Sequence, residues 1–361
     1  MSVDDRLAEA GDTPYLVVDR EILERNLATM AELARTAGFA LRPHAKTHKC
    51  LPIARRQLEL GATGLTVATV GEAEVFADAG VDDLFIAYPV WAAGARAARL
   101  RALAARVRLR VGTDSVPGVA ALAAALAGSS AEVLVEIDSG QHRSGVLPER
   151  AAEVAQAAER AGLAVRGVFT FPGHGYGPGN RAAAARDEAA ALAGAAATLN
   201  AAGFMCAVVS GGCTPTAMLS DQDALTEIRP GVYPFYDAQQ VELEVCGWPD
   251  VALTAMSTVV SVAADRVVLD AGSKVLGADR PAWATGFGRL PDHPDARITA
   301  LSEHHATVAF PSGPGPLGHG DRVRVAPNHV CNAVNLATEM WAVAPDQPTE
   351  RWPVAARGAN T

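Results

Sequence analysis

The stretch Leu41-Arg42-Pro43-His44-Ala45-Lys46-Thr47-His48-Lys49-Cys50 decides the fold, because it joins a strand to a helix through a basic loop. The apolar run 38–41 before it is typical of a buried strand, and helical spacing follows it. A lysine held at a strand end beside histidine and threonine can form a Schiff base with an aldehyde cofactor. Basic loops are more often simply solvated. The rest of the chain therefore decides the role of Lys46.

The alternation of strand and helix continues from residue 39 to residue 233. Eight strands connected by helices indicate a (β/α)8 TIM barrel, in which chemistry lies at the carboxyl ends of the strands. A doubly wound open sheet is the alternative that uses the same elements. The expected strands are 39–42, 64–68, 84–87, 107–111, 133–137, 165–171, 207–210 and a weaker eighth at 227–233. The expected helices are 21–37, 51–60, 71–79, 92–105, 116–127, 149–161 and 181–202.

A second domain is expected after the barrel, because the pattern changes near residue 251 to β-like runs separated by glycine and proline turns. We expect the barrel over 19–250, with Asp19 capping its first helix. A mainly β domain is expected over 251–361, joined by 1–18 because 15–18 is also strand-like. The expected β-like runs are 258–263, 266–269, 305–310, 322–325 and 341–343.

Composition limits the possible partners. The chain has 361 residues and a net charge of −9 without a long basic tract, so nucleic acid and anionic membranes are poor candidates. Its five cysteines are scattered and odd in number, which favours a reducing cytoplasm over a disulfide framework. The start Met1-Ser2-Val3-Asp4-Asp5 predicts no signal peptide, and no apolar run has the length of a membrane span. We expect a cytoplasmic protein that acts on a small molecule.

Two glycine-containing stretches are candidates for binding a phosphate group. Ser210-Gly211-Gly212-Cys213-Thr214-Pro215-Thr216 combines backbone N–H groups with hydroxyl donors, although a tight turn is the commoner use of Gly-Gly. Arg229-Pro230-Gly231-Val232-Tyr233 lies one strand later. The loops after strands seven and eight are the usual phosphate site of a barrel. The two stretches therefore support the same prediction, a phosphate site at this end of the barrel.

Two further strand ends carry polar residues. The stretch from Glu136 to Gly145 contains Arg143, which could bind a cofactor phenolate or a substrate carboxylate, or could be a solvated charge. His174 and Tyr176 lie in a glycine-rich loop. Such a loop rarely contributes to a core, so we expect both to contact the active site.

The expected β domain contains a pair of soft metal ligands in Pro327-Asn328-His329-Val330-Cys331-Asn332. On an extended strand, His329 and Cys331 would share one face. Imidazole with thiolate suits zinc better than magnesium or manganese, and two ligands alone would leave the site open to substrate. Glu303-His304-His305 could supply a base, His304 or His305, or could be a surface pair.

Together these motifs resemble the fold-type III pyridoxal-phosphate (PLP) enzymes, whose barrel is that of alanine racemase, and more narrowly the D-serine dehydratase and D-threonine aldolase family. The resemblance implies that Lys46 carries the Schiff base. It implies that Arg229 lies at the pyridine nitrogen, that His329 and Cys331 bind the metal, and that the protein is a homodimer. Phosphate binding would fall to Gly211, Gly212, Thr214, Gly231, Val232 and Tyr233.

Departures from family patterns indicate the reaction. All tyrosines precede residue 251, so the second base expected of alanine racemase, a tyrosine of the β domain, is missing. Cys331 stands where the aldolase pattern usually has aspartate, which resembles the zinc-dependent D-serine dehydratase type. The resemblance thus implies a lyase that converts D-serine or D-threonine to a 2-oxo acid and ammonia. The alternatives are an aldolase giving glycine and an aldehyde, a racemase, and a non-catalytic PLP-binding protein. Manganese or magnesium could replace zinc.

Overall fold

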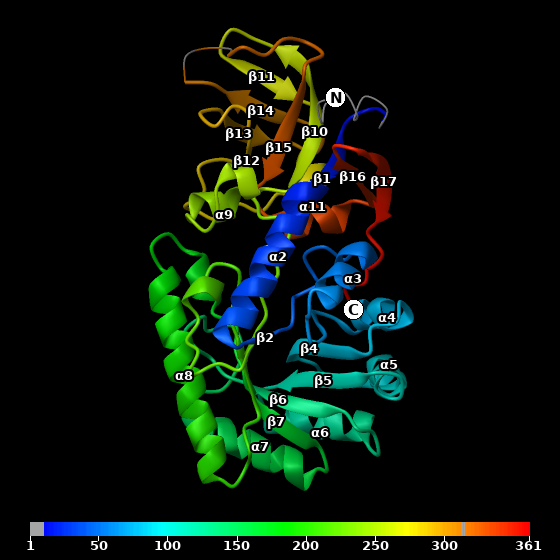
Figure 1. Cartoon of the computed structure of the whole chain (residues 1–361), viewed down its shortest axis with the longest axis vertical. Coiled ribbons are helices and arrows are strands. Elements are labelled where there is room, and N and C mark those ends of the chain that lie inside the picture. Colours follow the sequence, from blue (N-terminus) through cyan, green and yellow to red (C-terminus); the bar gives the residue numbers. More distant parts are fainter. Residues whose placement is uncertain (1–10, 312, 314) are drawn as a thin grey trace. The chain divides into compact units, whose positions relative to one another are not determined.

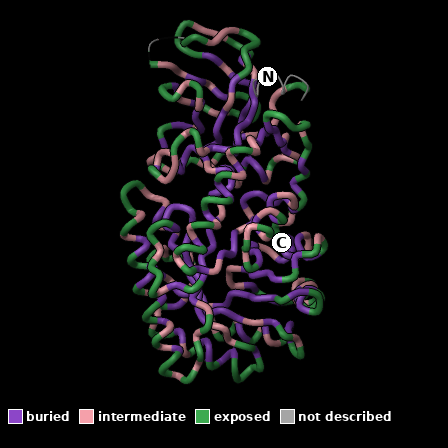
Figure 2. Tube along the Cα trace, in the orientation of Figure 1, coloured by how far each residue is buried: buried purple, intermediate pink, exposed green. Residues whose placement is uncertain are grey.

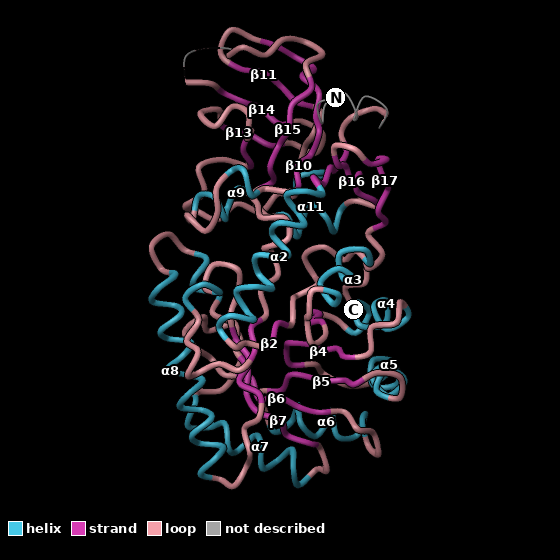
Figure 3. Tube along the Cα trace, in the orientation of Figure 1, coloured by secondary structure: helices cyan, strands magenta, loops and turns pink. Residues whose placement is uncertain are grey.

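The described chain divides into two compact units. The computed structural model describes residues 11–311, 313 and 315–361, so the start of the chain, for which we expect no signal peptide, lies outside the described residues. One unit comprises 29–46, 53–231 and 358–361. The other comprises the described residues of 11–28, 47–52 and 232–357. Helices and strands of both are shown in Figures 1 and 3.

The first unit is built on an eight-stranded parallel sheet with the order β2-β9-β8-β7-β6-β5-β4-β3. A parallel bridge between His44 and Thr66 joins its two edges, and the Ala45 N–H donates to the Thr66 carbonyl at 2.8 Å. This closure confirms the predicted barrel and disfavours the open sheet. The strands are β2 (Ala40–Leu41), β3 (Leu65–Val67), β4 (Asp83–Pro89), β5 (Arg108–Thr113), β6 (Glu132–Glu136), β7 (Ala164–Phe169), β8 (Val208–Gly211) and β9 (Glu227–Ile228).

Helices connect these strands on the outside of the sheet (Figure 1). Asp19 accepts the N–H groups of Glu21 and Ile22 at 3.0 Å each, which confirms the predicted cap. Residues of the strands are largely buried, and Figure 2 shows them in purple along the Cα trace. The longer helices are α2 (Arg20–Ala37), α3 (Leu51–Glu59), α4 (Val70–Asp78), α5 (Gly94–Ala104), α6 (Val116–Leu126), α7 (Ala151–Arg160) and α8 (Arg181–Ala201). The short 3-10 turns are η2 (Pro148–Arg150), η3 (Gly173–Tyr176), η4 (Ala217–Leu219) and η5 (Trp248–Asp250).

The eighth barrel strand is shorter than predicted, since β9 ends at Ile228. Pro230 has no N–H group and cannot continue a ladder. Its carbonyl still accepts the N–H of His44 at 3.0 Å. The residues after β9 therefore form a fixed loop at the barrel end.

The second unit is mainly β, as predicted. Its sheet has the order β13-β14-β11-β10-β1-β16-β17, with β15 paired to β10 and β12. Strand β1 pairs with β10 and β16, which confirms the expected pairing of 15–18 with this region. The strands are β1 (Tyr15–Asp19), β10 (Leu253–Val262), β11 (Arg266–Leu269), β12 (Gly288–Arg289), β13 (Arg297–Leu301), β14 (Ala306–Ala309), β15 (Arg322–Pro327), β16 (Glu339–Ala344) and β17 (Gln347–Pro353). Its helices are α9 (Ala238–Glu242), α10 (Ser273–Leu276) and α11 (Val330–Leu336).

No helix among the described residues combines the length and the apolar character that crossing a bilayer requires.

Candidate active site

A cavity of about 530 Å³ lies at the carboxyl ends of the barrel strands. Each of the eight strands contributes a lining residue from its own end or from the loop that follows it. This is the place where barrel enzymes hold their reactants, and the volume suits a cofactor with a small substrate. The lining residues are His44, Lys46, Ala68, Ala87, Tyr88, Pro89, Asp114, Arg143, Ser144, Phe171, Gly212 and Arg229.

Lys46 is fixed by the strand end before it and faces an aromatic ring. Its N–H donates to His44 Nδ1 at 3.5 Å. Its Nζ lies 5.6 Å from the centroid of the Phe171 ring, and Arg143 Cζ lies 5.2 Å from the same centroid. Phe171 thus holds two cations at the cavity through the negative face of its ring.

Arg229 is a buried cation of the cavity lining, with 5 % of its surface exposed. It donates to Ser210 Oγ at 2.5 Å and to the Thr170 carbonyl. Its guanidinium carbon also lies 5.5 Å and 5.6 Å from the ring centroids of Phe169 and Phe85. Bonds and rings together fix the direction of this side chain.

The glycine turn after β8 is shaped by a buried carboxyl group. Gly212 has φ of +72°, which L side chains rarely adopt, and its N–H donates to Glu188 Oε1 at 2.7 Å. A Cβ on Gly211 would lie 2.5 Å from the same oxygen. Both glycines are therefore required by the turn itself. Since Glu188 occupies the Gly212 N–H, a phosphate would have to use other donors of this loop or displace that bond.

Glu136 and Ser144 form a second polar pair beside the cavity. Ser144 lines the cavity and donates from Oγ to Glu136 Oε1 at 3.0 Å. Burial raises the pKa of Glu136 to about 7, while Ser144 and Arg143 act in the opposite direction. A carboxyl group that titrates near neutrality at a cavity can hold or release a proton.

The cavity lining includes four of the predicted site residues, namely Lys46, Arg143, Gly212 and Arg229. Five other predicted residues of this unit are close in the chain to lining residues but are not among the described lining residues themselves. They are His174, Tyr176, Gly211, Thr214 and Gly231.

His174 and Tyr176 lie in the turn η3 that follows β7. Nε2 of His174 lies 3.3 Å from Asp187 Oδ2, and its buried Nδ1 has no hydrogen-bond partner among the described residues. The Tyr176 ring centroid is 6.0 Å from that of Phe171. Tyr176 therefore supports the aromatic ring that Lys46 faces, and the active-site contact predicted for His174 stays a prediction.

Sequence reasoning missed Asp114, Ser144 and Phe171 as cavity residues. Asp114 directly follows β5, so the rule that chemistry lies at strand ends could have found it. The stretch from Glu136 to Gly145 was identified as a polar strand end, but it did not single out Ser144, whose place depends on its bond to Glu136 and on the Gly145 N–H bonding to Asp114 at 3.2 Å.

The predicted metal pair lies in the β unit, but not on a strand. Strand β15 ends at Pro327, His329 is the extended residue before α11, and Cys331 belongs to that helix. The expectation of one shared strand face is therefore wrong. The imidazole and the thiol still form a side-chain hydrogen bond, because the turn into the helix brings them together.

Two acidic residues hold the pair in place. Asp279 Oδ2 lies 2.6 Å from His329 Nδ1, and Asp237 Oδ2 accepts the Val330 N–H at 3.0 Å. The charge of Cys331 and the bond to Asp279 raise the pKa of His329 to about 11. Carboxylates that orient a metal-binding histidine in this way are common around metal centres.

Cys331 also contacts the residue that follows the candidate Schiff-base lysine. Its Sγ and the Thr47 Oγ1 form a hydrogen bond at 3.2 Å. Thr47 has no exposed surface and directly follows Lys46 in the chain. The soft-ligand pair is therefore tied to the motif that carries the lysine.

Among the described residues, no group of three or more His, Cys, Asp or Glu side chains is placed to hold a metal ion. His329 and Cys331 fit a metal as a pair, since an imidazole and a thiolate already in contact form a soft donor set. Exogenous ligands would complete the coordination. Of the other predicted residues in this unit, Val232 and Tyr233 are buried, and His304 is exposed with Nε2 3.5 Å from Lys274 Nζ.

Comparison with known proteins agrees with this geometry. A family sequence model described as "Alanine racemase, N-terminal domain" matches residues 18–239, and one described as "Putative serine dehydratase domain" matches residues 252–343. The D-threo-3-hydroxyaspartate dehydratase of Delftia sp. (strain HT23) is 35 % identical, covering 94 % of this chain and 96 % of the relative. The chain belongs to the D-serine dehydratase and D-threonine aldolase family of fold-type III PLP enzymes.

Other relatives of this family share the whole architecture. The D-threonine aldolase of Arthrobacter sp. is 34 % identical over 96 % of this chain and 93 % of the relative. The solved structure of the Delftia dehydratase has a TM-score of 0.88 at 33 % identity, covering 95 % of this chain and 97 % of that one. A mutant of that dehydratase has been solved in a metal-free form. Like these family members, the protein is a PLP-dependent lyase.

The cavity fits the cofactor of the family. The cationic side chains of Lys46, Arg143 and Arg229 line it, and Asp114 is the one carboxylate among its described lining residues. This excess of positive charge favours anionic ligands, such as a phosphorylated cofactor together with an amino-acid carboxylate. Lys46 is the lining amine that could join to an aldehyde.

Proposed function

We propose that this lyase acts on β-hydroxy D-amino acids with PLP and a divalent metal, most simply zinc. The proposed reaction is the dehydration and deamination of D-serine, D-threonine or D-3-hydroxyaspartate to a 2-oxo acid and ammonia. The observation that carries this proposal is the contact of Cys331 with Thr47, which joins the metal pair to the residue after Lys46. The Delftia relative, a dehydratase of a β-hydroxy D-amino acid, supports it.

Each residue of the cavity would have a separate role in binding or catalysis. Lys46 would bind the cofactor and, once replaced by the substrate amine, take the proton from the substrate Cα. Arg229 would face the ring nitrogen. Arg143 would bind the substrate carboxylate or the cofactor phenolate. When bound, PLP supplies an electron sink for the charge that develops at Cα. The phosphate would be held by Gly211, Gly212, Thr214, Gly231, Val232 and Tyr233, with His174, Tyr176 and His304 as further contacts.

His329 and Cys331 would hold the metal, whose Lewis acidity makes the β-hydroxyl a better leaving group. Thr47 would keep Cys331 close to the lysine motif. In the aldolase alternative the same ligands would assist loss of the hydroxyl proton, and the Cα–Cβ bond would break. The similarity to the Arthrobacter D-threonine aldolase supports this second reaction as the alternative.

We also propose the domain limits 19–250 for the barrel and 251–361 with 1–18 for the β domain. The two family matches, at 18–239 and 252–343, support this division. A homodimer in the cytoplasm is proposed as well, with a small-molecule substrate and no nucleic-acid or membrane partner. The net charge of −9 and five free thiols support the compartment and the choice of partner.

Product analysis with D-threonine and D-3-hydroxyaspartate tests the reaction, using PLP-loaded protein with zinc and the same protein after treatment with a chelator. We expect zinc-dependent ammonia with 2-oxobutyrate or oxaloacetate. Glycine with acetaldehyde or glyoxylate would establish the aldolase instead. A Lys46→Ala variant should give none of these products. If the wild-type protein forms neither set of products, lyase action on these substrates is refuted.

A further inference from the structure

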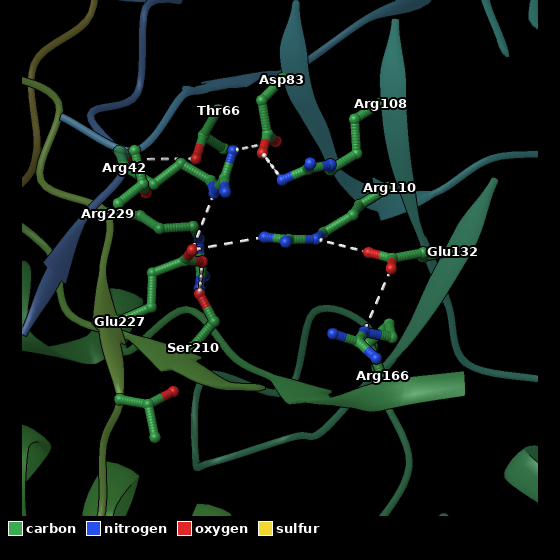
Figure 4. A network of polar contacts seen from close by, with 12 residues as sticks. Arg42, Thr66, Asp83, Arg108, Arg110, Glu132, Arg166, Ser210, Glu227 and Arg229 are labelled. Atoms are coloured by element: carbon green, nitrogen blue, oxygen red, sulfur yellow. Dashed lines mark hydrogen bonds and ion pairs between the residues drawn. The ribbon is translucent and has the colours of Figure 1, made fainter. Parts of the chain in front are cut away.

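A continuous series of polar contacts, buried near Glu227 and partly exposed at Arg108 and Arg166, runs through the barrel to Arg229 (Figure 4). Asp83 and Glu132, at one end of the series, are the first residues of β4 and β6. Arg229, at the other end, lines the cavity. The series therefore joins the strand beginnings to the active-site end of the barrel. Its labelled members are Arg42, Thr66, Asp83, Arg108, Arg110, Glu132, Arg166, Ser210, Glu227 and Arg229.

Glu227 is the branch point of this series. Only 3 % of its surface is exposed. Oε2 accepts from Arg42 Nε at 2.7 Å and lies 3.5 Å from Arg110 Nη1. Oε1 accepts from Ser210 Oγ at 2.5 Å. Both carboxylate oxygens are therefore engaged, one by arginines of the barrel interior and one by a hydroxyl.

The chemistry of the groups fixes the direction of each bond at Ser210. A guanidinium can only donate, so Ser210 Oγ accepts from Arg229 Nη1. An ionised carboxylate can only accept, so the hydroxyl proton points to Glu227. Ser210 thereby connects the negative charge of Glu227 to the cation at the cavity.

This connection matters because Arg229 is buried. Burial lowers the pKa of Arg229, and the charge of Glu227 is the foremost influence that raises it. Glu227 is not among the described lining residues of the cavity, and it is connected to Arg229 through Ser210. Buried ion pairs contribute little net stability on average, so fold stability alone does not explain the arrangement.

We propose that Glu227, acting through Ser210, is a positioning residue that keeps Arg229 aimed at the bound cofactor. This inference rests on the proposed function, in which Arg229 faces the cofactor ring. Loss of the connection would leave Arg229 with the Thr170 carbonyl and the rings of Phe85 and Phe169 as its remaining contacts. Its direction and its distance from the cofactor ring would then be less tightly fixed. The electronic state of the ring and the rate would then change more than the affinity for substrate.

Ser210→Ala is the primary test, because it removes one oxygen from the buried core and leaves both charges in place. We expect a shifted absorbance maximum of bound PLP, faster loss of PLP on dialysis, and a kcat lower by up to about 100-fold with little change in KM. Glu227→Gln should show the same spectral shift. If that variant does not fold, because Arg42 also loses its charged partner, Ser210→Ala alone still decides.

Glu132→Gln is the matched control. It makes the same change in the same interior, where Glu132 binds Arg110 and Arg166 at 2.9 and 3.1 Å but not Ser210. It should lower the melting temperature while leaving the PLP absorbance unchanged. An unshifted spectrum in Ser210→Ala, or an equal shift in Glu132→Gln, would overturn the proposal. A wild-type protein that binds PLP but forms no lyase product would refute the proposed reaction, while the spectra would still test the role of Glu227.

Discussion

At the scale of single residues, Glu188 shows how the glycine turn depends on a buried carboxyl group. The side chain has no exposed surface, and Oε2 has no hydrogen-bond partner among the described residues. Burial raises its pKa to about 7 from 4.5. Between these two values the folded protein keeps a proton that the unfolded chain has lost. The contribution of Glu188 to stability is therefore full below about pH 4.5 and is lost as the pH rises through 7.

We predict that Glu188→Gln reduces this loss. Glutamine keeps an oxygen for the Gly212 N–H but does not ionise. The variant should gain up to roughly 3 kcal/mol in free energy of unfolding, relative to wild type, between pH 5 and pH 8. Urea unfolding at both pH values measures the difference. Glu153→Gln, which alters an exposed ion pair with Arg150, should show no such gain. An equal response of the two variants would contradict the assignment.

Asp279 is the second residue whose role can be isolated. Its carboxylate lies 2.6 Å from His329 Nδ1 and so selects the ring nitrogen that would face a metal. Asp279→Asn should weaken zinc binding by about 10- to 100-fold in a competition titration with a chelator. PLP absorbance should not change. Asp292→Asn, which breaks an ion pair with Arg324 in the same unit, should leave zinc affinity as it was. Unaltered affinity in Asp279→Asn would remove this carboxylate from the metal centre.

At the scale of elements, the turn after β8 is the most restricted segment of the site. A Cβ on Gly211 would lie 2.5 Å from Glu188 Oε1 and 2.9 Å from Leu225 Cδ2. Gly211→Ala should therefore destabilise the protein by about 1–3 kcal/mol and loosen PLP binding. Thermal unfolding with and without PLP measures both effects. Gly194→Ala, inside helix α8 and with its new Cβ 3.5 Å from Pro148, should be neutral or stabilising. A Gly211 variant as stable as this control would show that the turn can relax.

Elements with a clear local pattern were predicted from sequence, whereas the helix α11, which depends on a distant acceptor, was not. The apolar runs of the barrel identified its strands, because buried parallel strands are apolar throughout. The helix that carries Cys331 was missed. Its first N–H, on Val330, is bonded by Asp237, which lies 93 positions earlier in the chain. No pattern near His329 reveals that acceptor, so the alternation of residues favoured a strand.

At the scale of the whole molecule, the candidate ligand sites fall on different stretches of backbone. The cavity residues after β2, β8 and β9 are linked by bonds from Arg42 N to the Ile228 carbonyl and from Arg229 N to the Gly211 carbonyl. The metal pair follows β15 in the other unit. From sequence, the order of the motifs along the chain predicted a barrel mouth, but the connection from Glu227 to Arg229 was not predicted. Glu227 opens β9, and only closure of the barrel brings Arg42 and Ser210 to it.

Hydrogen exchange followed by mass spectrometry should therefore separate the two ligands. A ligand that binds only the folded state slows local opening, by about 100-fold at a concentration 100 times its Kd. PLP added to cofactor-free protein should slow exchange most in segments 42–46, 210–214 and 227–231. Zinc removal should speed exchange most in 328–336, where the Val330 N–H depends on Asp237 beside the metal pair. If zinc removal instead affected mainly the barrel segments, the metal would have to bind through residues other than His329 and Cys331.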